Sequence, residues 1–225
     1  MNILIIADIH NDIENIPILI DKISLFNFDI IIANGDFTDI TLPKGFSRID
    51  ITELILEELK SLKKQIFVVP GNQDKELINF FEKEDISLHG IGKVIENIGF
   101  YGFGGAQTPF NTPLEPSENE IEKGLNESYK KIKNCKIKIQ VTHMPPARTK
   151  LDLIASGAHV GSETIRKFIE KNQPDVAISA HIHEAKGLDE LEKTKLINPG
   201  RFPEGYCGFI TIEKEKISTK IINLI

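Results

Sequence analysis

Short apolar runs rich in β-branched residues alternate along the chain with stretches whose apolar residues recur at helical spacing. The apolar runs predict buried strands at residues 3–7, 29–33, 65–69, 136–141 and 175–179. The helical spacing predicts helices at residues 16–26, 50–63, 75–84, 117–133 and 162–171. Strands that alternate with helices are typical of an α/β fold whose sheet is covered on both faces.

Capping residues sharpen three of these helix starts. We expect Asp50 with Glu53, and Ser117 with Glu120, to form capping boxes, and Ser162 to cap a third helix. The pattern is less regular elsewhere. Residues 94–98 and 100–103 predict a hairpin about Gly99, followed by a proline-containing loop at residues 104–116. The last predicted strands, which we expect to form a mainly antiparallel edge, are residues 194–197, 208–212 and 217–222. No repeat and no linker rich in Pro, Gly or Ser divides the sequence, so we expect one domain over residues 1–225.

Composition narrows the function classes. The 225 residues carry a formal net charge of −6, which argues against a protein that mainly coats nucleic acid or an anionic membrane. No apolar run approaches the ~20 residues that span a bilayer, and the N-terminal stretch does not read as a signal peptide. Cys135 and Cys207 are too few for a disulfide framework and indicate a reducing compartment. We therefore expect a cytoplasmic protein with no membrane partner and no nucleic-acid partner.

Polar residues gather where the predicted strands end. These segments are Asp8-Ile9-His10, Asn34-Gly35-Asp36, Gly71-Asn72-Gln73-Asp74, Thr142-His143 and His181-Ile182-His183. In open α/β sheets the carboxyl ends of the strands converge on one ligand-binding edge. If the backbone stays extended, Asp8 and His10 point the same way, as do His181 and His183.

The segments supply seven oxygen and imidazole donors: Asp8, His10, Asp36, Asn72, His143, His181 and His183. Each residue alone has a plain structural explanation, as a turn cap or as a hydrogen-bonded core histidine. Together they are too many for one tetrahedral ion, include no thiolate, and suit two divalent cations that share a carboxylate. Two cations about 3.5–4 Å apart are the usual arrangement for displacement at phosphorus. Gly35 and Gly71 precede candidate ligands, where a sharp turn often requires a positive φ.

In order and spacing, these segments resemble the signature blocks of the calcineurin-like metallophosphoesterase family: Asp-x-His, Gly-Asp-x-x-Asp, Gly-Asn-His-Asp, a single His and Gly-His-x-His. The resemblance runs from residue 8 to residue 183, and Asn198-Pro199-Gly200 resembles the family's closing turn. It implies a two-sheet β-sandwich flanked by helices, and a phosphohydrolase in which hydroxide held by the metals attacks phosphorus in line. The implied cofactors are two divalent ions, which could be Mn, Fe, Zn, Ni or Co.

The resemblance also assigns the ligands. Asp8, His10, Asp36 and His183 would hold one ion. Asp36, Asn72, His143 and His181 would hold the other, with Asp36 bridging. The resemblance implies small phosphoesters as substrates. Relatives are often dimers or larger, so we also expect a homo-oligomer.

Two positions depart from the family pattern. Ala180 replaces a glycine that is not a ligand, whereas Gln73 stands where the family has a histidine that stabilises the transition state or protonates the leaving oxygen. An acid at the position of Asp74 usually orients that histidine. Because glutamine cannot transfer a proton near pH 7, a factor of about 10²–10⁴ would be lost for poor leaving groups. Some small relatives that also lack this histidine resemble phosphodiesterases, so we expect a phosphodiesterase with Gln73 as a substrate contact and Asp36, Asn72 and Asp74 as catalytic residues.

Another residue could replace the missing proton donor. His159 lies in a loop that leads into a predicted helix N-terminus, where anions are favoured, so we consider it a candidate catalytic acid. Arg148 is a candidate contact for the substrate anion, and Lys150 and Arg201 are weaker ones. His89, beside Gly90, is expected to be a surface turn residue. The alternative function is a non-catalytic scaffold on the same fold, which only the Gln73 substitution favours.

Overall fold

Two β-sheets face each other across an apolar interior in the computed structural model, which describes residues 1–214 and 216–225. The first sheet contains, in spatial order, β11 (Lys216–Asn223), β10 (Tyr206–Glu213), β1 (Asn2–Ala7), β2 (Ile30–Asn34) and β3 (Gln65–Val69). The strands β1, β2 and β3 are parallel, and β10 and β11 extend the sheet as an antiparallel hairpin.

The second sheet has a parallel centre and antiparallel edges. Its order is β4 (Lys93–Ile95), β5 (Ile98–Phe103), β6 (Ile137–Thr142), β7 (Val176–Ile178), β9 (Thr194–Asn198) and β8 (Gly187–Leu191). The pairs β4–β5 and β8–β9 are antiparallel, and β5, β6, β7 and β9 run in one direction.

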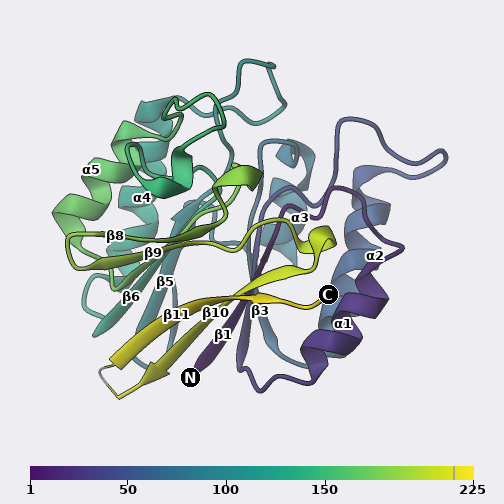
Figure 1. Cartoon of the computed structure of the whole chain (residues 1–225), viewed down its shortest axis with the longest axis horizontal. Coiled ribbons are helices and arrows are strands. Elements are labelled where there is room, and N and C mark those ends of the chain that lie inside the picture. The colour runs from purple at the N-terminus through teal and green to yellow at the C-terminus, as the bar shows by residue number, and fades with distance from the viewer. Residues whose placement is uncertain (215) are drawn as a thin grey trace.

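Helices cover the outer face of each sheet (Figure 1). The helices α1 (Ile16–Ser24), α2 (Arg48–Ser61) and α3 (Ile78–Lys83) belong to the first side, and α4 (Glu118–Ile132) and α5 (Glu163–Asn172) to the second. Short 3-10 helices are η1 (Lys75–Leu77), η2 (Lys150–Asp152), η3 (His183–Ala185) and η4 (Phe202–Glu204). Within the described residues, no helix is both long and apolar enough to cross a bilayer.

The pleat of the central strands explains why their sequences are apolar throughout. On β1, Ile3 and Ile5 face the interior between the sheets, while Leu4 and Ile6 pack under the helices of the first side. Side chains alternate between the two faces of a strand, so both faces must be apolar when both are buried. The predicted α/β fold, a two-sheet sandwich flanked by helices, is confirmed.

Several predicted boundaries are wrong for local reasons. The helix α2 begins at Arg48, because Ser47 and Asp50 form the capping box that was predicted at Asp50 and Glu53. The hairpin β4–β5 turns at residues 96–97, and Gly99 lies inside β5, where a Cβ would crowd Ile132 of α4. The predicted helix at residues 75–84 is divided between η1 and α3.

The closing strands were predicted to form one edge but lie in two sheets. Residues 194–197 belong to β9, which is parallel to β7 in the second sheet, whereas β10 and β11 complete the first sheet. The strand β8 was not predicted, because its sequence Gly-Leu-Asp-Glu-Leu places its two leucines on opposite faces and shows no apolar alternation. The capping residues Ser117 and Ser162 are confirmed.

Candidate metal centre

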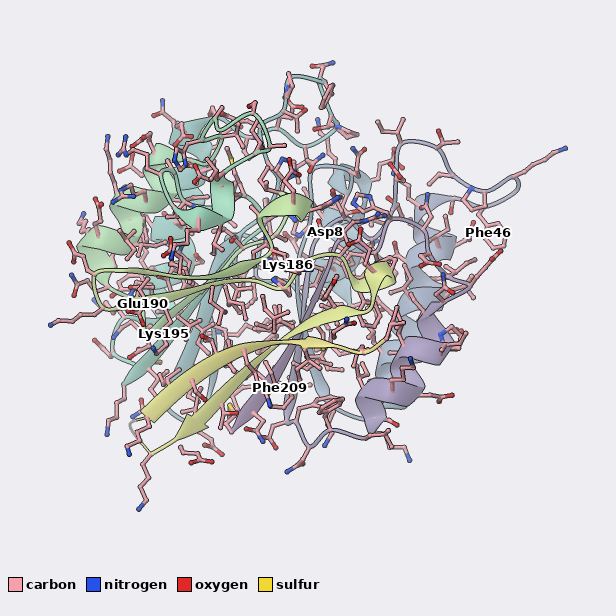
Figure 2. The ribbon with its side chains drawn as sticks, viewed as in Figure 1. Asp8, Phe46, Lys186, Glu190, Lys195 and Phe209 are labelled. Atoms are coloured by element: carbon pink, nitrogen blue, oxygen red, sulfur yellow. The ribbon has the colours of Figure 1, made fainter. Side chains whose placement is uncertain are left out.

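The predicted ligands come from segments that leave the sheets at one end. Asp8 and His10 follow β1, Asp36 follows β2, and Asn72 follows β3. His143 follows β6 of the second sheet, and His181 and His183 follow β7. Asp8 lies at the end of β1, between the helices of the two sides (Figure 2).

Backbone hydrogen bonds hold the loops after β1 and β2 side by side. The amides of Asp8 and His10 donate to the carbonyl oxygens of Gly35 and Asp36, at 3.1 and 2.9 Å. The loop after β3 is joined to them through side chains. The backbone amide of Gln73 donates to Oδ1 of Asp36 at 3.0 Å. Oδ2 of Asp74 accepts from the backbone amides of Gly71 and Phe37 at 2.8 and 3.2 Å.

The turns at the strand ends are tighter than extended backbone allows. Asp8, His10, Asp36 and His181 all have positive φ, as does Gly35. Asp8 and His10 do contribute to the same group of donors, as expected, but through a tight turn and not through strand alternation, since the strand ends at Ala7. The expectation for His181 and His183 is wrong, because they belong to different groups of donors. Gly71 does not have the positive φ expected of it; a Cβ at this position would overlap Asp36.

One group of donors consists of Asp8, His10 and His183, whose ligand atoms lie within 4.8 Å of one another. Oδ1 of Asp8 is 3.6 Å from Nε2 of His183, and Nε2 of His10 is 3.2 Å from the same atom. Asp39, the second acid of the Asp36 segment, lies behind His10, with its Oδ2 3.8 Å from Nδ1. This contact is too long for a hydrogen bond, so Asp39 acts on the imidazole only through its charge.

The second group consists of Asp36, His143 and His181, also within 4.8 Å. Nδ1 of His143 is 3.0 Å from the carbonyl oxygen of Asn34. A carbonyl can only accept, so Nδ1 carries a proton, and Nε2 faces the site, where a bound cation would replace any proton on that atom. That Nε2 atom lies 3.5 Å from Oδ2 of Asp36.

The two groups of donors lie next to each other, with Asp36 and Asp8 close to residues of both. Oδ2 of Asp36 is 3.8 Å from Nε2 of His10 in the first group and 3.5 Å from Nε2 of His143 in the second. Oδ1 of Asp8 is 3.9 Å from Nε2 of His143. Asp36 therefore lies between the two groups, the place that the family resemblance implies for a bridging carboxylate.

Buried polar atoms without partners test whether these residues fit metal ions. Among the described residues, no hydrogen-bond partner reaches either carboxylate oxygen of Asp8, Oδ1 of Asn72 or Nε2 of His143. These three residues are at most 3% exposed. Leaving a buried polar group unpaired is costly, and ionised groups cost more than neutral ones. Two divalent cations would satisfy all of these atoms, so the residues fit the implied metals.

Electrostatics in the protein without metal are consistent with a ligand set. Burial disfavours charge on Asp36 and His143, but their mutual attraction lowers the pKa of Asp36 to about 2 and raises the pKa of His143 to about 9. Burial and the neighbouring His143 lower the pKa of His181 to about 4, which keeps its imidazole neutral. Burial and the charge of Asp36 raise the pKa of Asp74 to about 6.

A cavity of about 550 Å³ opens onto the two groups. His10, Asp36, Asn72, His181 and His183 line its floor, and Gln73 lies beside them. Residues of other loops line the rest, both apolar and polar. Asp8 and His143 are fully buried behind this floor.

Two predicted site residues are placed elsewhere. Nδ1 of His159 lies 2.7 Å from Oδ1 of Asp152, and its side chain is 42% exposed and outside the cavity lining. Arg148 makes a two-pronged ion pair with Glu163, at 2.5 and 2.8 Å, and is also outside the lining. The weaker candidates pair with acids too, Lys150 with Asp189 and Arg201 with Glu204.

His89 is not the surface turn residue expected from the sequence. Its ring stacks on Phe103 with centroids 4.2 Å apart, and its Nδ1 accepts the amide of Gly104 at 2.9 Å. Burial lowers its pKa to about 4. Sequence reasoning also missed the contribution of Phe110 and Thr108 to the cavity, although the prolines that bound their loop were a usable signal.

Comparisons with known proteins agree with this geometry. The family model for calcineurin-like phosphoesterase matches residues 1–185. An uncharacterised protein of Methanocaldococcus jannaschii, MJ1162, is 34% identical over 219 residues, covering 94% of this chain and 92% of that protein.

Solved structures share the fold at lower identity. TT1561 of Thermus thermophilus is 19% identical, covers 100% of this chain and 99% of its own, and has a TM-score of 0.72. A dimetal phosphatase from Danio rerio is 10% identical, covers 100% of this chain and 96% of its own, and has a TM-score of 0.68. With its two sheets, its paired donor groups and a family match over residues 1–185, the chain belongs to the calcineurin-like phosphoesterase family.

Proposed function

We propose that the protein is a phosphohydrolase that uses two divalent cations and prefers phosphodiesters to phosphomonoesters. The observation that carries the proposal is the set of buried, unpartnered donors on Asp8, Asn72 and His143 at the base of an open cavity. When bound, two cations would activate water as a nucleophile and neutralise charge on the phosphoryl oxygens.

The chain's own residues divide the remaining work. Asp36 lies between the two donor groups and would bridge them. The backbone amide of Gln73 donates a hydrogen bond to its Oδ1. Asp74 contacts Gly71 and Phe37 and so positions the loops that carry Asn72 and Asp36. We therefore assign Asp74 a positioning role, with Asn72 as a ligand of the second cation.

The preference for diesters rests on Gln73 and on the charge of the lining. Gln73 is 6% exposed and reaches the cavity at the position of the family's proton donor, but an amide cannot protonate a leaving oxygen. Within the part of the chain that the structure describes, no lysine or arginine lines the cavity to balance the second charge of a monoester. Diesters, and esters with activated leaving groups, demand the least from such a site.

The test is hydrolysis by metal-stripped protein to which Mn²⁺, Ni²⁺, Co²⁺, Zn²⁺ or Mg²⁺ is returned singly. We expect metal-dependent cleavage of bis-p-nitrophenyl phosphate that exceeds cleavage of p-nitrophenyl phosphate, two bound cations per chain, and loss of turnover in Asp36→Asn. If two cations bind but neither substrate is hydrolysed, the result favours the alternative function, a non-catalytic scaffold. If no cation binds, the proposal fails.

His159 as proton donor and Arg148 as anion contact stay predictions. Both side chains are held by acids outside the cavity lining, Asp152 and Glu163 respectively. His159→Ala and Arg148→Ala would each lower kcat/KM for a diester with a poor leaving group if the residue reaches the substrate during turnover. Unchanged kcat/KM would remove that residue from the site.

A further inference from the structure

The lining of the cavity includes exposed apolar side chains in addition to the donor groups and several uncharged polar residues. Ile40, Phe110 and Val160 come from three loops far apart in the sequence and line the same cavity as His10 and His183. Their exposed fractions are 67%, 79% and 36%. We call these three residues the apolar collar. Single exposed apolar side chains are ordinary, but three around one opening mark a binding surface.

Hydrogen bonds brace the backbone of the loop from which the exposed ring of Phe110 extends. Oε1 of Glu115 accepts the hydroxyls of Thr108 and Thr112, at 2.5 and 2.7 Å. The Phe110 amide in turn donates to the Thr108 hydroxyl at 3.0 Å. The loop is tied to the floor of the site as well, since the Leu114 amide donates to the carbonyl oxygen of Asn72 at 2.9 Å. A preformed apolar surface costs little ordering when a ligand binds.

The charge of the lining restricts what the collar can accept. Of the described residues, none that lines this cavity is cationic, and Glu184 adds an acidic group at its edge. A second phosphate or a carboxylate on the substrate would meet no positive partner there. An uncharged apolar group would instead bury itself against the collar.

We propose that the apolar collar of Ile40, Phe110 and Val160 seats an uncharged apolar substituent of a phosphodiester substrate. This inference rests on the proposed function and specifies its substrate class. The phosphoryl group would lie over the donor groups, and one ester substituent, alkyl or aromatic, would extend to the collar across a cavity of about 550 Å³.

Binding of phosphinates to the metal-loaded protein tests the inference without turnover, because their carbon–phosphorus bonds are not hydrolysed. The probes are dimethylphosphinate, hexyl(methyl)phosphinate and the same hexyl compound with a terminal carboxylate, titrated by calorimetry. Each methylene removed from water is worth about a fourfold gain in affinity. We expect the hexyl compound to bind at least tenfold more tightly than dimethylphosphinate, and the carboxylate to abolish most of that gain.

A matched pair of variants locates the effect. Phe110→Ser should weaken binding of the hexyl compound at least fivefold and leave dimethylphosphinate unchanged. Phe46→Ser is the control, because Phe46 is also an exposed phenylalanine on a loop, 41% exposed, but lies far from Asp8 and outside the cavity lining (Figure 2). It should change neither affinity.

Three results would overturn the inference: equal affinity for the dimethyl and hexyl compounds, no loss from the terminal carboxylate, or equal effects of Phe110→Ser and Phe46→Ser. If metal-dependent hydrolysis of bis-p-nitrophenyl phosphate persists in that case, only the collar assignment fails. If the metal-loaded protein neither hydrolyses that diester nor binds any phosphinate, the proposed function fails together with the inference.

Discussion

Four candidate ligands, Asp8, His10, Asp36 and His181, have φ between 49° and 69°. This left-handed conformation costs an L-residue roughly 1–2 kcal/mol, so surrounding structure must hold it. For Asp8, His10 and Asp36, the hydrogen bonds between the loops after β1 and β2 do so. Nine other described non-glycine residues also have positive φ, so this backbone conformation is not confined to the candidate ligands.

Gly71 is the position at which a single methyl group should damage this arrangement. A Cβ there would overlap the carboxylate and amide of Asp36. We expect Gly71→Ala to lower the free energy of unfolding by about 1–3 kcal/mol, as overpacking does, and to lose at least one bound cation. Denaturant unfolding and metal analysis measure both. Gly187→Ala is the matched control, because its Cβ would meet its nearest neighbour at an ordinary 3.7 Å, and it should retain both cations.

Gln73 gives the second prediction at the residue scale. Replacing it by histidine restores a group that can carry a proton at a buried position beside Asp36. We expect Gln73→His to raise kcat for esters with poor leaving groups at least tenfold, toward the lower end of the ~10²–10⁴ that general acids supply. p-Nitrophenyl esters, whose leaving group needs little protonation, serve as the internal control. An equal gain on both substrate types would point to a cause other than proton transfer.

The residues that come together in the two groups of donors could be predicted from the sequence, but their backbone geometry could not. Asp8 and His10 are polar residues that interrupt an apolar strand pattern, which is visible in a single sequence. Their turn depends on amide contacts with Gly35 and Asp36, distant in the sequence, and no local pattern encodes that pairing. The same holds for Arg148, whose partner Glu163 lies on another element.

At the scale of elements, apolar central strands and capped helices were predictable because their signals are local. The failures come from tertiary contacts. Gly99 reads as a turn but lies inside β5, where the close packing of α4 leaves no room for a side chain. The strand β8 pairs only with β9 at the sheet edge, and its side chains are mostly exposed or half-buried. It therefore lacks the apolar pattern of the central strands. The sequence likewise does not show that β9 is parallel to β7 and β10 is antiparallel to β1, because these pairings depend on the sheet that each strand joins.

His89 joins the segment before β4 to the end of β5. Its titration should change the free energy of unfolding with pH. Its folded pKa of about 4 lies below the ordinary value of 6.5, so the unfolded chain binds the extra proton between these pH values. Stability from this group is therefore full above about pH 6.5 and is lost as the pH falls toward 4. We expect wild type to lose about 2–3 kcal/mol through His89 over this range.

Comparison with His89→Asn isolates that contribution. The asparagine oxygen can still accept the Gly104 amide but does not titrate near these pH values, although the stacking on Phe103 is lost. The variant should be less stable at pH 7 and should lose less stability on acidification. Denaturant unfolding at several pH values between 7 and 4.5 gives the two curves, and parallel curves would contradict the assignment.

At the scale of the whole molecule, the candidate site joins the two sheets. Asp8, His10, Asp36 and Asn72 follow strands of the first sheet, while His143, His181 and His183 follow strands of the second. Two hydrogen bonds cross the same seam. The Asn34 side chain donates to the carbonyl oxygen of Thr142, and His143 donates to that of Asn34, both at 3.0 Å. Cations bound here would therefore add to the apolar packing and the hydrogen bonds that hold the two halves together.

This arrangement predicts a large dependence of thermal stability on metal. Each cation present at a hundred times its dissociation constant should add about 2.7 kcal/mol, because the unfolded chain lacks the assembled site. For a domain of this size, that is a rise in Tm of about 5–10 °C per cation. Asp8→Asn, which removes a carboxylate of the first group only, should retain about half of the total shift. Scanning calorimetry of metal-stripped protein with Mn²⁺ or Zn²⁺, and again after addition of a chelator, measures the effect. If the Tm were the same in all three states, the buried unpartnered oxygens of Asp8 would need an explanation other than metal, and the link between the sheets would rest on packing and hydrogen bonds alone.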